Sequence, residues 1–62
     1  MKIVALIPTL NEADNIRFIT KTIDGGLKKV PGKPEIIVVN ADSGSIDHTQ
    51  EIFLDTKTHF PK

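Results

Sequence analysis

Two runs of apolar, mostly β-branched residues dominate the hydrophobic pattern of the chain, at residues 2–8 (KIVALIP) and 35–41 (EIIVVNA). Neither run alternates between apolar and polar positions. A continuous apolar run is typical of a strand that is buried on both faces, as in a parallel sheet covered by helices. Pro8 is predicted to end the first strand, because proline has no N–H to donate to a central ladder.

The segment between the two runs has the period of an amphipathic helix. Its apolar positions recur at spacings of three or four and form one stripe, which consists of Ile16, Ile19, Ile23 and Leu27. Phe18 falls off this stripe, so the pattern gives it no core position. We therefore expect a helix that packs its isoleucine face against the strands.

Polar residues mark the ends of this helix. Asn11 is a good N-cap, and Glu12 and Asp14 would follow in the first turn, where the helix dipole favours negative charge. Residues 24–26 (DGG) are predicted to end the helix, since glycine readily adopts the left-handed conformation. The loop that follows, residues 28–34, has turn chemistry in its Pro-Gly pair.

A second helix is predicted after the second strand. It would begin near Ser45 or Asp47, either of which could cap it, and would carry Ile46, Ile52 and Phe53. The helical pattern fades towards the end of the chain. The predicted order is strand, helix, strand, helix, and hence an α/β unit with parallel strands.

This order has a geometric consequence for residues 8–12 (PTLNE) and 40–45 (NADSGS). A crossover between parallel strands is right-handed almost without exception and puts both strand C-termini at one edge. Open parallel sheets bind ligands just outside these carboxyl ends. Both segments are polar and follow directly on an apolar run. We therefore expect them to lie side by side as a binding surface.

Composition narrows the possible classes of protein. With 62 residues, the chain is a single small domain at most and is marginally stable by itself. It has no cysteine, which excludes disulfides and thiolate metal sites and is consistent with a cytoplasmic location. Basic and acidic residues balance, with no clustered basic face for a nucleic acid. No apolar run is long enough for a membrane segment, and His48 and His59 are expected at the surface.

A sheet of two strands would leave both edges free, and a free edge invites pairing with another chain. We therefore expect residues 1–62 to be the N-terminal, nucleotide-binding part of one larger domain, or else a unit that self-associates.

The two polar segments together resemble the start of nucleotide-sugar glycosyltransferases of the A-type fold. In that family the first strand ends in Pro-x-x-Asn-Glu, which residues 8–12 match in full, and the second in Asp-Asp-Gly-Ser-x-Asp. Residues 42–47 (DSGSID) match the second pattern except at Ser43, where most members have aspartate. The motifs are most similar to those of glucosyl-3-phosphoglycerate synthases. The resemblance covers residues 3–53 and implies a fragment of a Rossmann-like nucleotide-diphospho-sugar transferase domain.

The resemblance implies that this chain supplies half of the site for the nucleotide-sugar donor, UDP-linked in our expectation. Leu10 would lie against the base, and Glu12 would accept hydrogen bonds from the ribose hydroxyls. Asp42 or Ser43 would read the uracil edge, and Gly44 would let the backbone approach closely. The implied nucleotide-binding set is Pro8, Thr9, Leu10, Glu12, Asp42, Ser43 and Gly44.

The resemblance also implies a divalent ion, Mg²⁺ or Mn²⁺, in the full-length enzyme, held by an Asp-x-Asp motif that would lie beyond position 62. Residues 40–42 (NAD) resemble that motif only superficially, because one carboxylate beside an amide is a poor site for such ions. No catalytic residue and no metal ligand is expected in this chain, so it would be inactive alone.

Other functions stay open at the level of the sequence. Within the family, an inverting transferase acting on a polyprenyl phosphate or a polysaccharide is possible. Outside it, the chain could be a non-catalytic βαβ module or a self-associating fragment. A dinucleotide-binding Rossmann unit is poorly supported, because no G-x-G-x-x-G follows the first strand.

Overall fold

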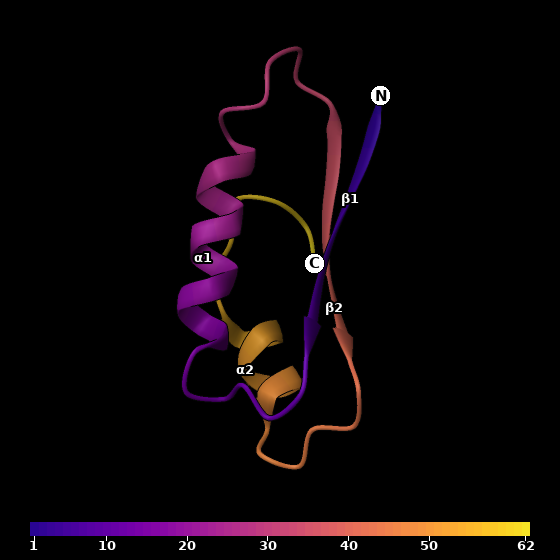
Figure 1. The fold of residues 1–62 in the computed structure, drawn as a ribbon. Helices are drawn as coiled ribbons and strands as arrows, with labels where there is room; N and C mark the ends of the chain where they lie inside the picture. The colour runs from indigo at the N-terminus through magenta and orange to yellow at the C-terminus, as the bar shows by residue number, and fades with distance from the viewer.

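The computed structural model describes all of residues 1–62, and two helices lie on one side of a two-stranded parallel sheet (Figure 1). This confirms the predicted α/β class, the parallel strands and the β-α-β-α order. Assignment to a Rossmann-like transferase domain stays a prediction. The elements in chain order are β1 (Lys2–Thr9), α1 (Ile16–Leu27), β2 (Glu35–Asp42) and α2 (Thr49–Asp55).

The core draws one large side chain from each element. Ile7 of β1, Ile16 of α1, Val38 of β2 and Phe53 of α2 form a single cluster, and none of them is more than 4% exposed. The rest of the α1 stripe is partly buried against it. The predicted stripe is therefore confirmed, and Phe18, which falls off it, is 74% exposed.

The opposite face of the sheet is uncovered. Val4 and Leu6 of β1 are 60% and 63% exposed, and Ile37 of β2 is 39% exposed. The prediction that the strands are buried on both faces is therefore wrong for this chain. Its physical reason is that α1 and α2 lie on the same side of the sheet (Figure 1). The apolar pattern is present on both faces, but this chain covers only one of them.

Pro8 does not end β1, which continues to Thr9. The carbonyl of Thr9 accepts a hydrogen bond from the amide of Ser43 at 2.9 Å, so the main chain of Thr9 faces β2. Successive residues of a strand face opposite sides, and the nitrogen of Pro8 therefore points to the free edge of the sheet. Proline is tolerated there because no ladder hydrogen bond is lost.

α1 begins later and ends slightly later than predicted. Asn11 has a positive φ of 52° and lies in a loop, and the N-cap residue of α1 is Asn15, whose side chain makes no capping bond. The predicted cap at Asn11 is therefore wrong. The helix continues through residues 25–26 to Leu27, at a cost that is typically about 1 kcal/mol for each glycine in a helix interior.

α2 also begins later than predicted, at Thr49. Ile46 therefore lies outside the helix and is 88% exposed, whereas Phe53 is in the core. Asp47 still acts at the helix start, because its carboxylate accepts a hydrogen bond from the Thr49 amide at 3.2 Å. The helix therefore begins two or more residues after the predicted start near Ser45 or Asp47.

The segment after α2 returns to the sheet and runs along the outer edge of β2. The amide of Val38 donates to the carbonyl of Pro61 at 2.9 Å. Asp24 of α1 holds the same segment, because its carboxylate accepts hydrogen bonds from the amides of His59 (2.9 Å) and Phe60 (3.1 Å). This edge of the sheet is therefore partly closed by the chain itself.

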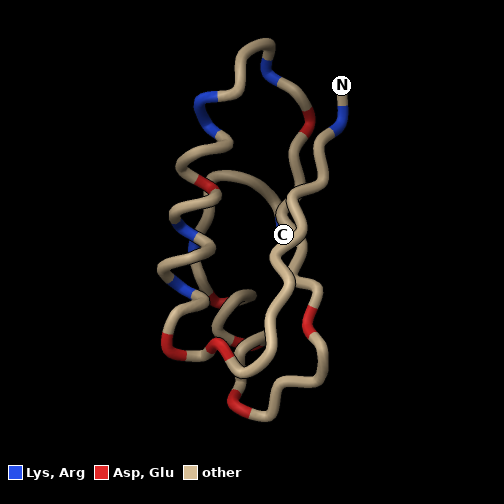
Figure 2. The backbone as a smooth tube through the Cα atoms, in the orientation of Figure 1, with Lys and Arg blue, Asp and Glu red and all other residues tan.

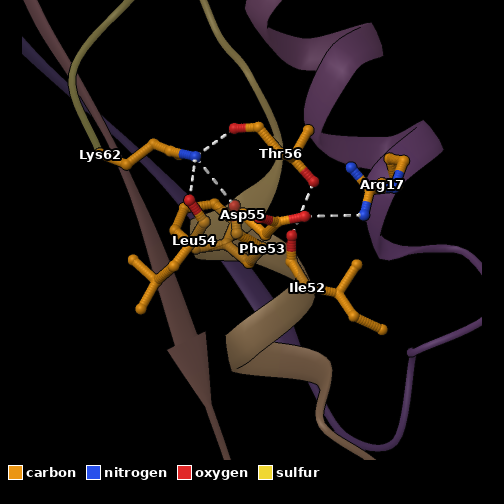
Figure 3. A network of polar contacts seen from close by, with 7 residues as sticks. All are labelled: Arg17, Ile52, Phe53, Leu54, Asp55, Thr56 and Lys62. Atoms are coloured by element: carbon orange, nitrogen blue, oxygen red, sulfur yellow. Dashed lines mark hydrogen bonds and ion pairs between the residues drawn. The ribbon is translucent and has the colours of Figure 1, made fainter.

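The end of the chain also closes the C-terminus of α2 (Figure 3). The ammonium group of Lys62 donates to the carbonyls of Phe53 (3.1 Å) and Leu54 (2.7 Å), where a helix favours a cation. The ion pair between Arg17 and Asp55, at 3.4 Å, is solvent-exposed and contributes little. Neither helix has the length and apolarity that crossing a bilayer requires.

Candidate functional site

The two loops that follow the strands meet at one end of the sheet, which we call the rim: the first loop is residues 10–15 and the second loop is residues 43–48. Because the strands are parallel and Thr9 pairs with Asp42 in the register, both loops leave the sheet at the same level. Figure 1 shows them together at the lower end of the molecule. The predicted juxtaposition of the two polar segments is confirmed.

Asp42 organises the second loop. One carboxylate oxygen accepts from the hydroxyls of Thr9 (2.8 Å) and Ser45. The other accepts from the amides of Gly44 (3.0 Å) and Ser45 (2.7 Å). These bonds stabilise the charged form and lower the pKa of Asp42 to about 2, with the Ser45 hydroxyl as the largest cause. Both oxygens are thus used inside the chain.

Gly44 permits this turn. Its φ of 97° lies in a region that favours glycine, and the resulting backbone directs its amide to Asp42. A Cβ at this position would meet no atom within 4 Å. Backbone conformation, and not lack of space, is therefore the reason for glycine here.

The side chains of Thr9 and Asn40 link the C-terminal ends of β1 and β2 by hydrogen bonds. Thr9 is 6% exposed; its hydroxyl donates to Asp42 and accepts from the side-chain amide of Asn40 at 2.8 Å. The same amide group of Asn40 donates to the carbonyl of Ile7 at 3.0 Å. Thr9, which the resemblance places in the nucleotide-binding set, is thus buried and supports Asp42.

Asn11 connects the two loops. Its backbone amide donates to the hydroxyl of Ser45 at 2.8 Å, and its side-chain oxygen accepts from the backbone amide of Ile46 at 3.0 Å. The pair of bonds runs in both directions between the loops. It fixes the middle of the first loop against the second loop.

A second connection joins the end of the first loop to the start of α2. The amide of Glu12 donates to the Thr49 hydroxyl at 2.9 Å, and the amide of Ala13 donates to the Asp47 carboxylate at 3.1 Å. The Thr49 hydroxyl also donates to Asp47 and is the main reason why the pKa of Asp47 is lowered. The two loops therefore form one hydrogen-bonded unit.

These bonds consume most of the backbone amides of the rim. Donors are used inside the chain at residues 11–13 of the first loop and at residues 43–46 of the second loop. A phosphate cradle needs several free amides that point at one anion. The rim is not built in that way, so its interaction with a ligand falls to its side chains.

Three side chains of the predicted set remain open to solvent. Leu10 is 57% exposed, Ser43 is exposed and its hydroxyl makes no hydrogen bond, and Pro8 is exposed at the edge of β1. The Glu12 carboxylate makes a single long hydrogen bond, accepted from the Asn15 side chain at 3.4 Å, while its own backbone is fixed on both sides. Glu12 is therefore a positioned carboxylate with acceptor capacity to spare.

The rim is acidic. Glu12, Asp14, Asp42 and Asp47 lie within its two loops or beside them, and residues 8–15 and 40–49 contain no lysine or arginine. Figure 2 shows acidic residues gathered at this end and most basic residues elsewhere. A free diphosphate would be repelled here, whereas an uncharged nucleoside would not.

The residues of the rim do not fit the divalent ion that the resemblance implies. No group of three or more histidine, aspartate or glutamate side chains is arranged to hold a metal ion. Asp42 has both oxygens engaged by hydrogen-bond donors, and Mg²⁺ and Mn²⁺ favour several oxygen ligands. The residues of the rim alone therefore do not provide the ligand set that such an ion needs.

No cavity of the molecule is lined by residues of the two rim loops. The largest, about 520 Å³, is at the opposite end of the sheet between the strand starts and the residues Phe60 and Pro61. A smaller one of about 280 Å³ lies beside α2. The rim itself is an open surface, and it could contact only one side of a nucleotide.

His48 and His59 are exposed, as predicted. His48 has a positive φ of 68° and its ring nitrogen lies 3.0 Å from the Glu51 carboxylate, which raises the pKa of His48. The pair is exposed to solvent on both sides.

Sequence reasoning did not identify the residues that connect the loops. It interpreted Asn11 and Ser45 as possible helix caps, placed Asn40 only as part of a polar segment, and gave Thr49 no role. One local signal was available for Asn11, because asparagine is enriched among residues with positive φ. The cross-loop partners lie more than 30 positions away in the sequence, where no local pattern reaches.

Comparisons of the chain with protein-family models, curated proteins and solved structures gave no match.

The bonds to Asp42 predict how the second loop responds to acid. The pKa of Asp42 in the folded chain, about 2, is below the ordinary aspartate value of 3.8. The stability that these bonds contribute is therefore fully present above pH 3.8 and is lost as the pH falls through about 2. We expect the carboxyl carbon of Asp42, followed by NMR, to titrate near pH 2.

A matched pair of variants tests the cause of this shift. Ser45→Ala is expected to raise the midpoint of Asp42 more than Thr9→Val, because the Ser45 hydroxyl has the larger effect on the pKa. A wild-type midpoint at or above 3.8 would contradict the hydrogen-bonded loop.

Proposed function

We propose that the rim binds the nucleoside half of a nucleotide-sugar donor, and that the chain serves a glycosyltransferase that uses this donor. The observation that carries the proposal is the meeting of the Pro-x-x-Asn-Glu and Asp-x-Gly-Ser segments at one rim, bonded into a single unit. The donor would be UDP-linked, and the activity would take place in the cytoplasm. The chain would supply the nucleoside contacts and would not be active alone.

Glu12 is the proposed ribose contact. Its amide and carbonyl are held by Thr49 and by the start of α1, so the residue is fixed, while one carboxylate oxygen has no partner. Two neighbouring hydroxyls of a ribose are donors that suit such an acceptor-only group. The neighbouring Leu10, which is mostly exposed, offers an apolar surface to the base.

Ser43 is the proposed contact with the edge of the base. Asp42 and Ser43 were equal candidates from the sequence, but the carboxylate of Asp42 already accepts hydrogen bonds on both oxygens. The Ser43 hydroxyl makes no such bond, and it can accept the N3–H of uracil. In the proposal Asp42 and Thr9 position Ser43 and Gly44, and they do not contact the ligand.

A self-associating or structural βαβ module is the second candidate function. The uncovered sheet face, with Val4 and Leu6 more than half exposed, favours it, because apolar surface of this kind is usually covered by a partner. Sedimentation equilibrium of the chain tests self-association, which requires a dimer or larger species; a monomer at all concentrations would contradict it.

The proposal is tested by titrating the ¹⁵N-labelled 62-residue chain with uridine, without divalent ions, and following the amide shifts. We expect saturable shifts confined to residues 9–12 and 42–45, with a Kd on the order of 1 mM for a one-sided site. UDP should bind more weakly than uridine, because the rim is acidic. Adenosine is the control, since it has the same ribose with a different base.

Three results would contradict the proposal. One is the absence of shifts up to about 10 mM uridine, a concentration well above the expected Kd. Another is a set of shifts centred on the large cavity at the opposite end, which is lined by Phe60 and Pro61. A spectrum without dispersion would contradict it as well, because the rim exists only in the folded chain.

Glu12→Ala is expected to weaken uridine binding by about 1–3 kcal/mol, the usual range for hydrogen bonds to a charged group. At a starting Kd on the order of 1 mM, this raises the Kd to about 5–160 mM, so the shifts at about 10 mM uridine would fall well short of those of wild type. Asp14→Ala is the matched control, because it removes a neighbouring exposed carboxylate that makes no bond to the rest of the rim. Equal loss in both variants would show a general charge effect and not a ribose contact.

A further inference from the structure

Asn11 stands between two proposed contact residues but points to neither. Both its backbone amide and its side-chain oxygen are hydrogen-bonded to the second loop. The backbone amide donates to the Ser45 hydroxyl at 2.8 Å, and the side-chain oxygen accepts from the Ile46 amide at 3.0 Å. Leu10 and Glu12 flank it directly in the sequence. The position of Asn11 therefore sets where these two side chains lie relative to Ser43.

Position 11 makes two separate demands on its residue, one on the backbone conformation and one on the side chain. The φ of Asn11 is 52°, a conformation that asparagine, aspartate and glycine adopt far more readily than other residues. The side chain must also present an acceptor to the Ile46 amide. Glycine meets the first requirement alone, alanine meets neither, and aspartate meets both.

The bond from Asn11 is the one hydrogen bond that holds Ile46 itself, although Ala13 bonds to the neighbouring Asp47. The Ile46 side chain is 88% exposed, so no apolar packing fixes the residue. The bonds to Asp42 fix residues 44 and 45 from the other side, and none of them comes from a residue of the first loop. Without the Asn11 acceptor, the two loops would keep fewer bonds between them, and the Ile46 amide would turn to solvent.

We propose that Asn11 is a positioning residue for nucleoside binding: it holds Leu10 and Glu12 of the first loop in register with Ser43 of the second loop. It contributes to affinity by reducing the ordering that binding would otherwise require. The inference rests on the proposed function of the rim and adds a residue that does not touch the ligand.

Three substitutions of Asn11 separate the effect of its backbone conformation from the effect of its side-chain acceptor. Asn11→Asp keeps both requirements, and we expect it to bind uridine within about twofold of wild type. Asn11→Gly keeps the conformation and loses the acceptor, and Asn11→Ala loses both; each is expected to raise the Kd for uridine by about three- to tenfold, the effect of one lost hydrogen bond. Asn11→Gly is the decisive variant because glycine adopts this φ without strain and is expected to fold.

A second measurement reports the bond itself without any ligand. Hydrogen exchange of the Ile46 amide should be slow in wild type and in Asn11→Asp, and fast in Asn11→Gly and Asn11→Ala. The exchange rates at residues of β1 and β2 should stay unchanged, which a general loss of stability would not allow.

The outcomes distinguish this inference from the proposed function. If uridine binds wild type and Asn11→Gly equally well, or if Ile46 exchange is the same in all variants, the positioning role is wrong and the proposed function stands. If uridine does not bind wild type, the proposed function fails, and the positioning role fails with it. Binding that falls in Asn11→Gly and is restored in Asn11→Asp, in step with Ile46 exchange, supports both.

Discussion

Phe53→Ala is expected to leave most of the chain unfolded at room temperature. Phe53 is 3% exposed and joins Ile7, Ile16 and Val38 in the only buried apolar cluster of the fold. Truncating a buried phenylalanine costs about 3–5 kcal/mol. A domain of this size without disulfides rarely has more than about 3–5 kcal/mol of stability in total. One side chain thus accounts for nearly all of the available free energy of unfolding.

Phe18→Ala is the matched control for this prediction. It removes the same side chain from a position that is 74% exposed, and the expected change is within about 0.5 kcal/mol. The chain has no tryptophan or tyrosine, so urea unfolding is best followed by far-ultraviolet circular dichroism. A Phe53→Ala chain with the helical signal and urea midpoint of wild type would show that this cluster is not the core.

Asp24→Ala is expected to release the segment that follows α2 and to reduce the free energy of unfolding by about 2–3 kcal/mol. Asp24 is 9% exposed, and its carboxylate accepts hydrogen bonds from the amides of His59 and Phe60. Bonds to a charged acceptor are the stronger ones, at about 1.5–3 kcal/mol each, and the freed amides recover part of this from water. The amide of Val38, which donates to Pro61, should then exchange faster.

Asp55→Ala provides the comparison for Asp24→Ala. It removes a carboxylate whose ion pair with Arg17 is exposed, and such pairs contribute between nothing and about 1 kcal/mol. The idea of a held segment would be refuted by equal urea midpoints for the two variants, or by unchanged exchange at Val38 in Asp24→Ala.

The strands and their direction could be predicted from the sequence because their signal is local. The apolar runs at residues 2–8 and 35–41 lie within one residue of β1 and β2, and a helix between them requires parallel pairing. The α1 stripe from Ile16 to Leu27 was predictable for the same reason, since spacing alone defines it. The meeting of the two polar loops then followed from topology.

The boundaries of the helices could not be predicted because they depend on distant partners. Asn11 is a good cap by type, but its bonds to Ser45 and Ile46 hold it in a loop and delay α1 until Ile16. Likewise, Asp24 was interpreted as a helix end, although its partners are amides about 35 positions later. Side chains that bond across such separations leave no trace in a local pattern.

The availability of each candidate site residue was also invisible in the sequence. Asp42 and Ser43 are adjacent and both could serve as acceptors, yet only the structure distinguishes a saturated carboxylate from a free hydroxyl. The burial of Thr9 has the same origin, because its hydroxyl lies between Asp42 and Asn40. Motif matching gives the residue types at a rim but not which of their atoms are already engaged.

The distribution of charge gives the molecule a polarity that its balanced composition hides. The acidic rim lies at one end of a body 38 Å long. The start of β1, with Lys2, and the loop between α1 and β2, with Lys28, Lys29 and Lys33, lie towards the other end (Figure 1). At physiological ionic strength electrostatic fields decay over about 8 Å, so an approaching molecule senses only the end that it meets. An anion and a cation would each find an attractive pole on a chain whose formal net charge is zero.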